Sequence, residues 1–125
     1  MIWFLGNRRK RADRYMAQGK VDKAISLYLK DRAWDALVAA YQNRGDFAAA
    51  GDAAERGGFN TDAAELYERA GDLRSAARVW LKLGQKDQAA RAYEAAQAYD
   101  LAVELYVSTG RPARGGDVLA AAGRW

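Results

Sequence analysis

The chain has 125 residues, no cysteine, no histidine and one proline, and its mean hydropathy is negative although half of its residues are hydrophobic. This composition is typical of a helical protein with one modest core, and it excludes disulfide frameworks, thiol chemistry and histidine-based zinc or proton-transfer sites. The net charge of +4 originates in residues 7–14, which hold five basic residues and one acidic residue, so it does not describe a surface-wide nucleic-acid footprint.

Glycine recurs with a period of 13 residues, and eight of the twelve glycines lie on this grid. Between grid points the apolar residues follow a 3.6-residue period, which predicts one amphipathic helix of about ten residues per unit. Each helix is expected to end at the grid residue, because glycine adopts a positive φ without a Cβ clash. Two such helices form an antiparallel hairpin of 26 residues. The grid residues are Gly6, Gly19, Arg32, Gly45, Gly58, Gly71, Gly84, Gln97, Gly110 and Gly123.

The first six residues, MIWFLG, align with VWLKLG at 79–84, so they are expected to be the end of a unit that closes at Gly6. This apolar start is too short for a signal peptide, and the basic residues follow it instead of preceding it. No apolar run approaches the roughly 20 residues that a membrane-spanning helix needs. We therefore expect a cytoplasmic protein, and the alanine, arginine and glycine content is typical of a GC-rich bacterial source.

The unit over 7–19 carries a basic run beside the apolar start. Four interpretations stay open for it: a solvated helix face, contact with an acidic protein, contact with an anionic membrane surface, and contact with nucleic acid. Trp125 presents a second apolar residue at the other end of the chain, where a polar capping helix would be typical of a solenoid. The candidate partner-binding residues are Ile2, Trp3, Phe4, Arg8, Arg9, Lys10, Arg11 and Trp125.

The units from 7–19 onward share two inward positions when the grid residue is numbered 13. Position 5 is mostly alanine, which lets helices approach closely, and position 9 is mostly aromatic, which fills the space between them. Asp46 and Asp72 directly follow grid glycines and are expected to cap the next helix. The expected core residues are Tyr15, Tyr28, Tyr41, Tyr67, Trp80, Tyr93 and Tyr106 with Ala24, Ala63, Ala76, Ala89 and Ala102.

Two units depart from this pattern. The unit over 46–58 lacks the aromatic residue and carries Gly51 inside its helix, and the unit over 111–123 carries Gly115 and Gly116 where inward residues belong. Such glycines indicate either a shallow groove for a partner or tight contact and fraying of helices, and we favour the second interpretation. An internal glycine destabilises a helix by about 1 kcal/mol relative to alanine.

The stretch from Ala63 to Gly84, AAELYERAGDLRSAARVWLKLG, combines A-x-x-x-Y with a following A-G-D. This pattern resembles the short-helix repeats of tetratricopeptide, coatomer and intraflagellar-transport solenoids. The resemblance implies an all-α fold, a right-handed α-α superhelix of about nine short antiparallel helices in a single domain over residues 1–125. The hairpin is shorter than the tetratricopeptide unit of about 34 residues, and the W-x-x-L-G-x-x-Y signature is not reproduced. A peptide-clamp site therefore does not carry over.

No catalytic motif, metal-ligand spacing or cofactor fingerprint occurs in the sequence, so we expect no enzyme activity, no metal and no cofactor. The aromatic series at position 9 is interpreted as core and not as a base-stacking platform. The first functional hypothesis is a non-catalytic adaptor for protein partners. The alternatives are a structural module that self-associates through its apolar ends, and a module that contacts membrane or nucleic acid through its basic end.

Overall fold

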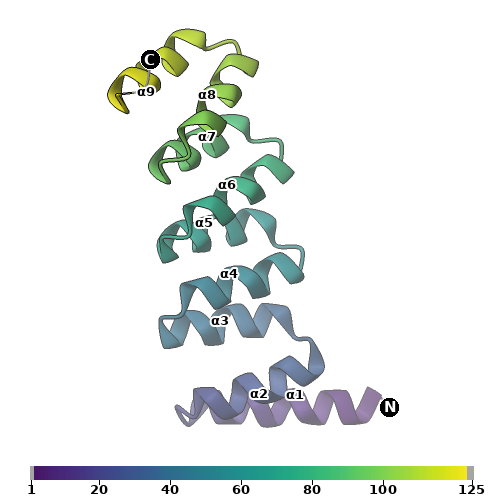
Figure 1. Ribbon diagram of the computed structural model, residues 1–125. Helices are drawn as coiled ribbons and strands as arrows, with labels where there is room; N and C mark the ends of the chain where they lie inside the picture. Colours follow the sequence, from purple (N-terminus) through teal and green to yellow (C-terminus); the bar gives the residue numbers. More distant parts are fainter. Residues whose placement is uncertain (1, 124–125) are drawn as a thin grey trace. The chain divides into compact units, whose positions relative to one another are not determined.

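The computed structural model describes the backbone of residues 2–123 and the side chains of residues 7–123 (Figure 1). This part of the chain is α-helical apart from its turns, and it holds nine helices joined by turns of two or three residues. The expected all-α fold is thereby confirmed. The helices are α1 (Ile2–Ala17), α2 (Val21–Asp31), α3 (Trp34–Arg44), α4 (Phe47–Arg56), α5 (Asn60–Ala70), α6 (Leu73–Lys82), α7 (Lys86–Ala95), α8 (Tyr99–Ser108) and α9 (Pro112–Ala121).

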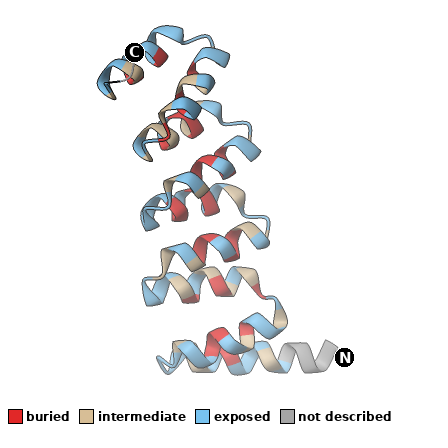
Figure 2. Cartoon of the chain, viewed as in Figure 1, coloured by how far each residue is buried: buried red, intermediate tan, exposed pale blue. Residues whose placement is uncertain are grey.

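Helices that follow one another in sequence pack side by side. The chain divides into two compact units, one up to Ala63 and one from Ala64, so that the division falls within α5. In the first unit α1 contacts α2, α2 contacts α3 and α3 contacts α4; in the second unit α6, α7, α8 and α9 pack in the same consecutive way. Figure 2 shows the buried residues on the facing sides of these helices. Each unit is therefore solenoid-like, and the handedness of a superhelix stays a prediction.

None of the helices in the described part of the chain is both long and apolar enough to cross a membrane.

The turn between helices has the same geometry at every grid point from Gly19 to Gly123. The grid residue has a φ between +53° and +82° at each of these positions. The residue after it donates its backbone N–H to the carbonyl at position 9 of the preceding helix, over 2.7–3.0 Å in eight successive turns. This bond is typical of the Schellman motif and satisfies a carbonyl that the helix end would otherwise leave unpaired. The predicted role of the grid glycines is confirmed from Gly19 onward.

Arg32 and Gln97 occupy grid points without glycine and still adopt the left-handed conformation, with φ values of +53° and +63°. The closing bonds are retained, since Ala33 N–H reaches Tyr28 O over 3.0 Å and Ala98 N–H reaches Tyr93 O over 2.8 Å. A side chain in this conformation carries a penalty of about 1 kcal/mol. Packing on both sides of the turn therefore imposes the conformation against local preference.

The residue that closes one helix also opens the next. Asp46 and Asp72 donate their backbone N–H groups backward to Tyr41 O and Tyr67 O. Their side chains accept forward, from Ala49 N over 3.1 Å and from Ser75 N over 3.3 Å. The predicted capping role of both aspartates is confirmed, and it explains why so short a turn leaves few backbone groups unpaired.

The expected core residues line the facing sides of the helices. Ala24, Ala63, Ala76, Ala89 and Ala102 are fully buried, which confirms position 5 as the site of closest approach. The aromatic residues at position 9 divide into two groups by burial. The buried members are Tyr28, Tyr67, Trp80 and Tyr106, and the half-buried members are Tyr15, Tyr41 and Tyr93.

The prediction that a helical unit ends at Gly6 is wrong. Helix α1 is continuous from Ile2 to Ala17 and runs through Gly6. A glycine inside a helix destabilises it by only about 1 kcal/mol, so glycine alone does not end one.

The glycines of the two irregular units differ in their surroundings. A Cβ at Gly115 would lie 3.3 Å from Val103 Cγ1 of α8, which confirms tight helix contact at this position, whereas a Cβ at Gly116 would meet no atom within 4 Å. At the end of α4, a Cβ on Gly57 would lie 2.8 Å from Trp34 Cβ and 2.8 Å from the Phe59 ring. The absence of a Cβ at Gly57 therefore leaves room for the Trp34 side chain and the Phe59 ring.

The left-handed turns make opposite predictions for two substitutions. Gly71→Ala should lower the free energy of unfolding by about 1 kcal/mol, because a Cβ is strained at positive φ although it meets no neighbour. Gln97→Gly should raise it by up to about 1 kcal/mol because it removes that strain. Urea denaturation followed by circular dichroism measures both, and a loss of stability in Gln97→Gly would contradict the account.

A second pair of substitutions separates crowded glycines from open ones. Gly57→Ala should lower the free energy of unfolding by about 1–3 kcal/mol, because its Cβ would overlap Trp34 and Phe59. Gly116→Ala should raise it by up to about 1 kcal/mol, since it replaces a helical glycine in open space. Thermal and urea denaturation of both variants check this, and equal effects would show that the packing at Gly57 is loose.

Candidate functional site

The candidate partner-binding residues of the sequence do not form one continuous site in the described part of the chain. Lys10 and Arg11 are exposed on α1, whereas Arg8 and Arg9 contact neighbouring helices. The candidates outside the described residues are the side chains of Ile2, Trp3 and Phe4 and the whole of Trp125.

Arg8 and Arg9 connect α1 to the next two helices. Arg8 Nη1 lies 2.7 Å from Oδ1 of Asp31 on α2, whose side chain is only 7% exposed. Arg9 donates two hydrogen bonds to the carboxylate of Asp35 on α3, over 2.8 and 3.3 Å. This hydrogen bonding raises the pKa of Arg9 and lowers the pKa of Asp35. Two of the four residues of the predicted basic run, Arg8 and Arg9, therefore form contacts between helices.

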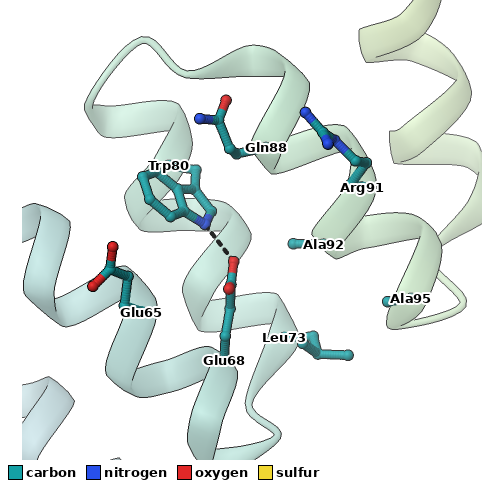
Figure 3. A pocket seen from close by; sticks show the side chains of 8 residues that line it. All are labelled: Glu65, Glu68, Leu73, Trp80, Gln88, Arg91, Ala92 and Ala95. Carbon is teal, nitrogen blue, oxygen red and sulfur yellow. Dashed lines mark hydrogen bonds between the residues drawn. The ribbon is translucent and has the colours of Figure 1, made fainter.

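A groove of about 510 Å³ lies along α5, α6 and α7 in the second unit (Figure 3). Its floor is apolar and its rims are polar, with carboxylates on the α5 side and a guanidinium on the α7 side. Trp80 of α6 lies between the two rims, with Glu68 below it and Gln88 beside it. The lining residues are Glu65, Glu68, Leu73, Trp80, Gln88, Arg91, Ala92 and Ala95.

The indole of Trp80 is fixed by a carboxylate of the preceding helix. Trp80 is 8% exposed, and its Nε1 donates a hydrogen bond of 2.7 Å to Glu68 Oε1 on α5. A buried aromatic residue with a polar tip normally finds such a partner. This contact holds the ring in one orientation at the floor of the groove.

The corresponding positions one hairpin later are arranged differently. Tyr106 of α8 donates its hydroxyl hydrogen to Glu94 Oε1 on α7 over 3.1 Å. Arg114 of α9 then binds both oxygens of Glu94, over 3.1 and 3.0 Å, and its guanidinium lies 5.7 Å from the Tyr106 ring centroid. Between α7 and α9 the carboxylate is thus covered by Arg114, whose Nη2 donates to both carboxylate oxygens.

One substitution in the repeat explains why the groove at Trp80 stays open. Gln88 of α7 has the same repeat position as Arg114 of α9, and Glu68 has the same position as Glu94. Glutamine is shorter and uncharged, so it offers no bidentate pair to the carboxylate. Glu68 therefore keeps only the indole as its partner among the bonds observed, and the space above Trp80 is not filled.

This groove was not predicted from the sequence, because the aromatic residues at position 9 were interpreted as core alone. A signal was present: a glutamate lies 12 residues before Trp80 and another lies 12 residues before Tyr106. That spacing pairs each ring with the preceding helix. The effect of glutamine at position 88 is seen only when Gln88 is compared with Arg114, the residue at the same repeat position of α9.

The described residues contain no group of three or more His, Cys, Asp or Glu side chains arranged to hold a metal ion. The arrangement at Trp80 suits reversible binding of a polypeptide, since it offers an apolar floor, two carboxylates and a guanidinium.

Comparison with protein-family models, with curated proteins and with solved structures found no match to this chain.

Tyr28 extends the pairing of rings with carboxylates to the first unit and predicts a pH dependence. Its hydroxyl donates to Asp13 of α1, and burial together with this carboxylate raises the pKa of Tyr28 to about 12. Since the unfolded chain releases this proton near pH 10, the contribution to stability is complete below pH 10 and is lost between pH 10 and about 12.

Unfolding free energies measured from pH 8 to 12 should therefore fall more steeply in the natural chain than in Tyr28→Phe, by up to about 2 kcal/mol. The phenylalanine variant is the control, because it retains every other tyrosine and lysine. Parallel pH profiles for the two chains would show that Tyr28 titrates normally.

Proposed function

We propose that the chain is a non-catalytic protein-binding scaffold of the tetratricopeptide-like kind, and that the groove of α5–α7 receives a peptide segment of its partner. The observation that supports this most directly is the apolar floor between charged rims of opposite sign. Helical arrays offer long surfaces for such contacts and need no chemistry at them.

The lining defines the chemistry of the segment. Leu73, Trp80 and Ala92 suit one apolar side chain, which would displace water from the floor. The carboxylates of Glu65 and Glu68 suit a basic residue on one side of that anchor. Arg91 is exposed and forms no ion pair with any described residue, so it suits an acidic residue on the other side.

Arg114 of α9, which covers Glu94, suggests a substitution that would block the groove at Trp80. Gln88→Arg should place a guanidinium over Glu68 as Arg114 lies over Glu94, and it should fill the space above Trp80. The matched control is Gln42→Arg, which makes the same change of side chain and charge at an exposed position of α3 in the other unit.

Selection of a displayed random-peptide library on the natural chain tests the proposal. Enriched peptides should carry an apolar residue between a basic and an acidic one, and their affinity should fall at least about tenfold in Gln88→Arg. Gln42→Arg should bind them as the natural chain does. Failure to enrich any peptide, or equal binding by both variants, would sink the proposal.

A further inference from the structure

The first three helices hold more positive charge than their own acids can compensate. Four acidic residues lie between residues 7 and 44, and each has a partner. Asp13 accepts from Tyr28, Asp22 pairs with Arg44 over 2.8 Å, Asp31 pairs with Arg8, and Asp35 pairs with Arg9. Seven cations of this stretch form no ion pair with any described residue: Lys10, Arg11, Arg14, Lys20, Lys23, Lys30 and Arg32.

Four of these seven cations gather around one aromatic ring. Arg11, Arg14, Tyr15 and Gln18 line a hollow of about 220 Å³ on α1. The ammonium groups of Lys20 and Lys23, at the start of α2, lie 6.0 and 5.7 Å from the Tyr15 ring centroid. We name Arg11, Arg14, Lys20 and Lys23 the Tyr15 basic cluster.

The cluster is self-repulsive until an anion joins it. Arg11 and Arg14 are three residues apart and share a face of α1, where like charges destabilise a helix. The Tyr15 ring attracts the two lysine ammonium groups through its π face, and the same residue lines the hollow together with Arg11 and Arg14. A carboxylate in the hollow would accept from a guanidinium and from the Gln18 amide, and would relieve the repulsion.

The form of the cluster favours an acidic polypeptide over other anions. A nucleic acid presents a long row of phosphates and is met by an extended stripe of cations, whereas these four cations are grouped at one ring: Arg11 and Arg14 line a small hollow with Tyr15, and Lys20 and Lys23 lie against the Tyr15 ring. An anionic membrane is met by basic residues beside inserted apolar side chains, and the described residues that line the hollow, Arg11, Arg14, Tyr15 and Gln18, include no aliphatic side chain.

We propose that the Tyr15 basic cluster binds an acidic segment of a partner protein, with one carboxylate in the hollow between Arg11 and Arg14 and neighbouring carboxylates on Lys20 and Lys23. This site belongs to the first unit and does not depend on the groove at Trp80. The sequence placed the basic contact on Arg8–Arg11; the ion pairs of Arg8 and Arg9 move it one to two turns along α1 and onto α2.

The test is fluorescence anisotropy at low ionic strength with a labelled oligo-glutamate peptide, and with an oligo-glutamine peptide of equal length as the neutral probe. The test variant is Arg11→Gln with Arg14→Gln. The control is Arg74→Gln with Lys86→Gln, which removes the same charge from exposed positions of the second unit. Circular dichroism establishes that both variants are folded.

We expect the glutamate peptide to bind and the glutamine peptide not to bind, with affinity lost about tenfold or more in the Arg11/Arg14 variant only. Gln88→Arg should leave this binding unchanged, so failure here and failure of the groove are distinguishable. Equal losses of affinity in the test and control variants would show that binding depends on net charge alone, and would overturn the site. Tighter binding of anionic vesicles or single-stranded DNA, lost in the same Arg11/Arg14 variant, would overturn the assignment to a protein partner.

Discussion

A left-handed residue at every thirteenth position governs the rest of this structure. At each grid point from Gly19 to Gly123 the backbone has positive φ, and from Gly19 to Gly110 the following N–H reaches back to the carbonyl at position 9. Because the next residue both closes one helix and opens the following one, the rotation of each helix about its axis is set by its predecessor. The alanine of position 5 and the residue of position 9 therefore return to the facing sides in helix after helix. That this conformation persists at Arg32 and Gln97, where side chains oppose it, shows that it belongs to the repeat and not to glycine alone.

The turn geometry that sets the rotation of each helix also sets where the functional residues lie. It brings the position-9 ring of an even-numbered helix against a carboxylate of the preceding helix, as in Trp80 with Glu68 and Tyr106 with Glu94. Whether the space above the ring is filled then depends on one residue of the next helix. Arg114 fills it by a contact with both carboxylate oxygens of Glu94, and Gln88 does not fill it at Glu68. A regular array thus acquires an individual groove through a single change of side chain.

Much of the fold could be predicted from the sequence, because it depends on local chemistry. The glycine grid, the aspartate caps at Asp46 and Asp72, and the buried alanines each follow from properties of single residues near one turn. The end expected at Gly6 was wrong, because glycine permits a helix end but does not impose one. The candidate site was harder to predict. The pairing of Arg8 with Asp31 and of Arg9 with Asp35 joins residues more than 20 positions apart, and it depends on how α1 lies against α2 and α3.

The central claim is that the backbone is left-handed at every grid point from Gly19 to Gly123, including those without glycine. Three-bond and one-bond NMR couplings that report φ, measured at Arg32 and Gln97 in isotope-labelled protein, test it most directly. The account predicts couplings typical of positive φ at both residues, with right-handed helical values on the helices that flank them. Right-handed values at Arg32 or Gln97 would mean that the helix continues through the grid point, and would contradict the repeat geometry on which the groove and the basic cluster both rest.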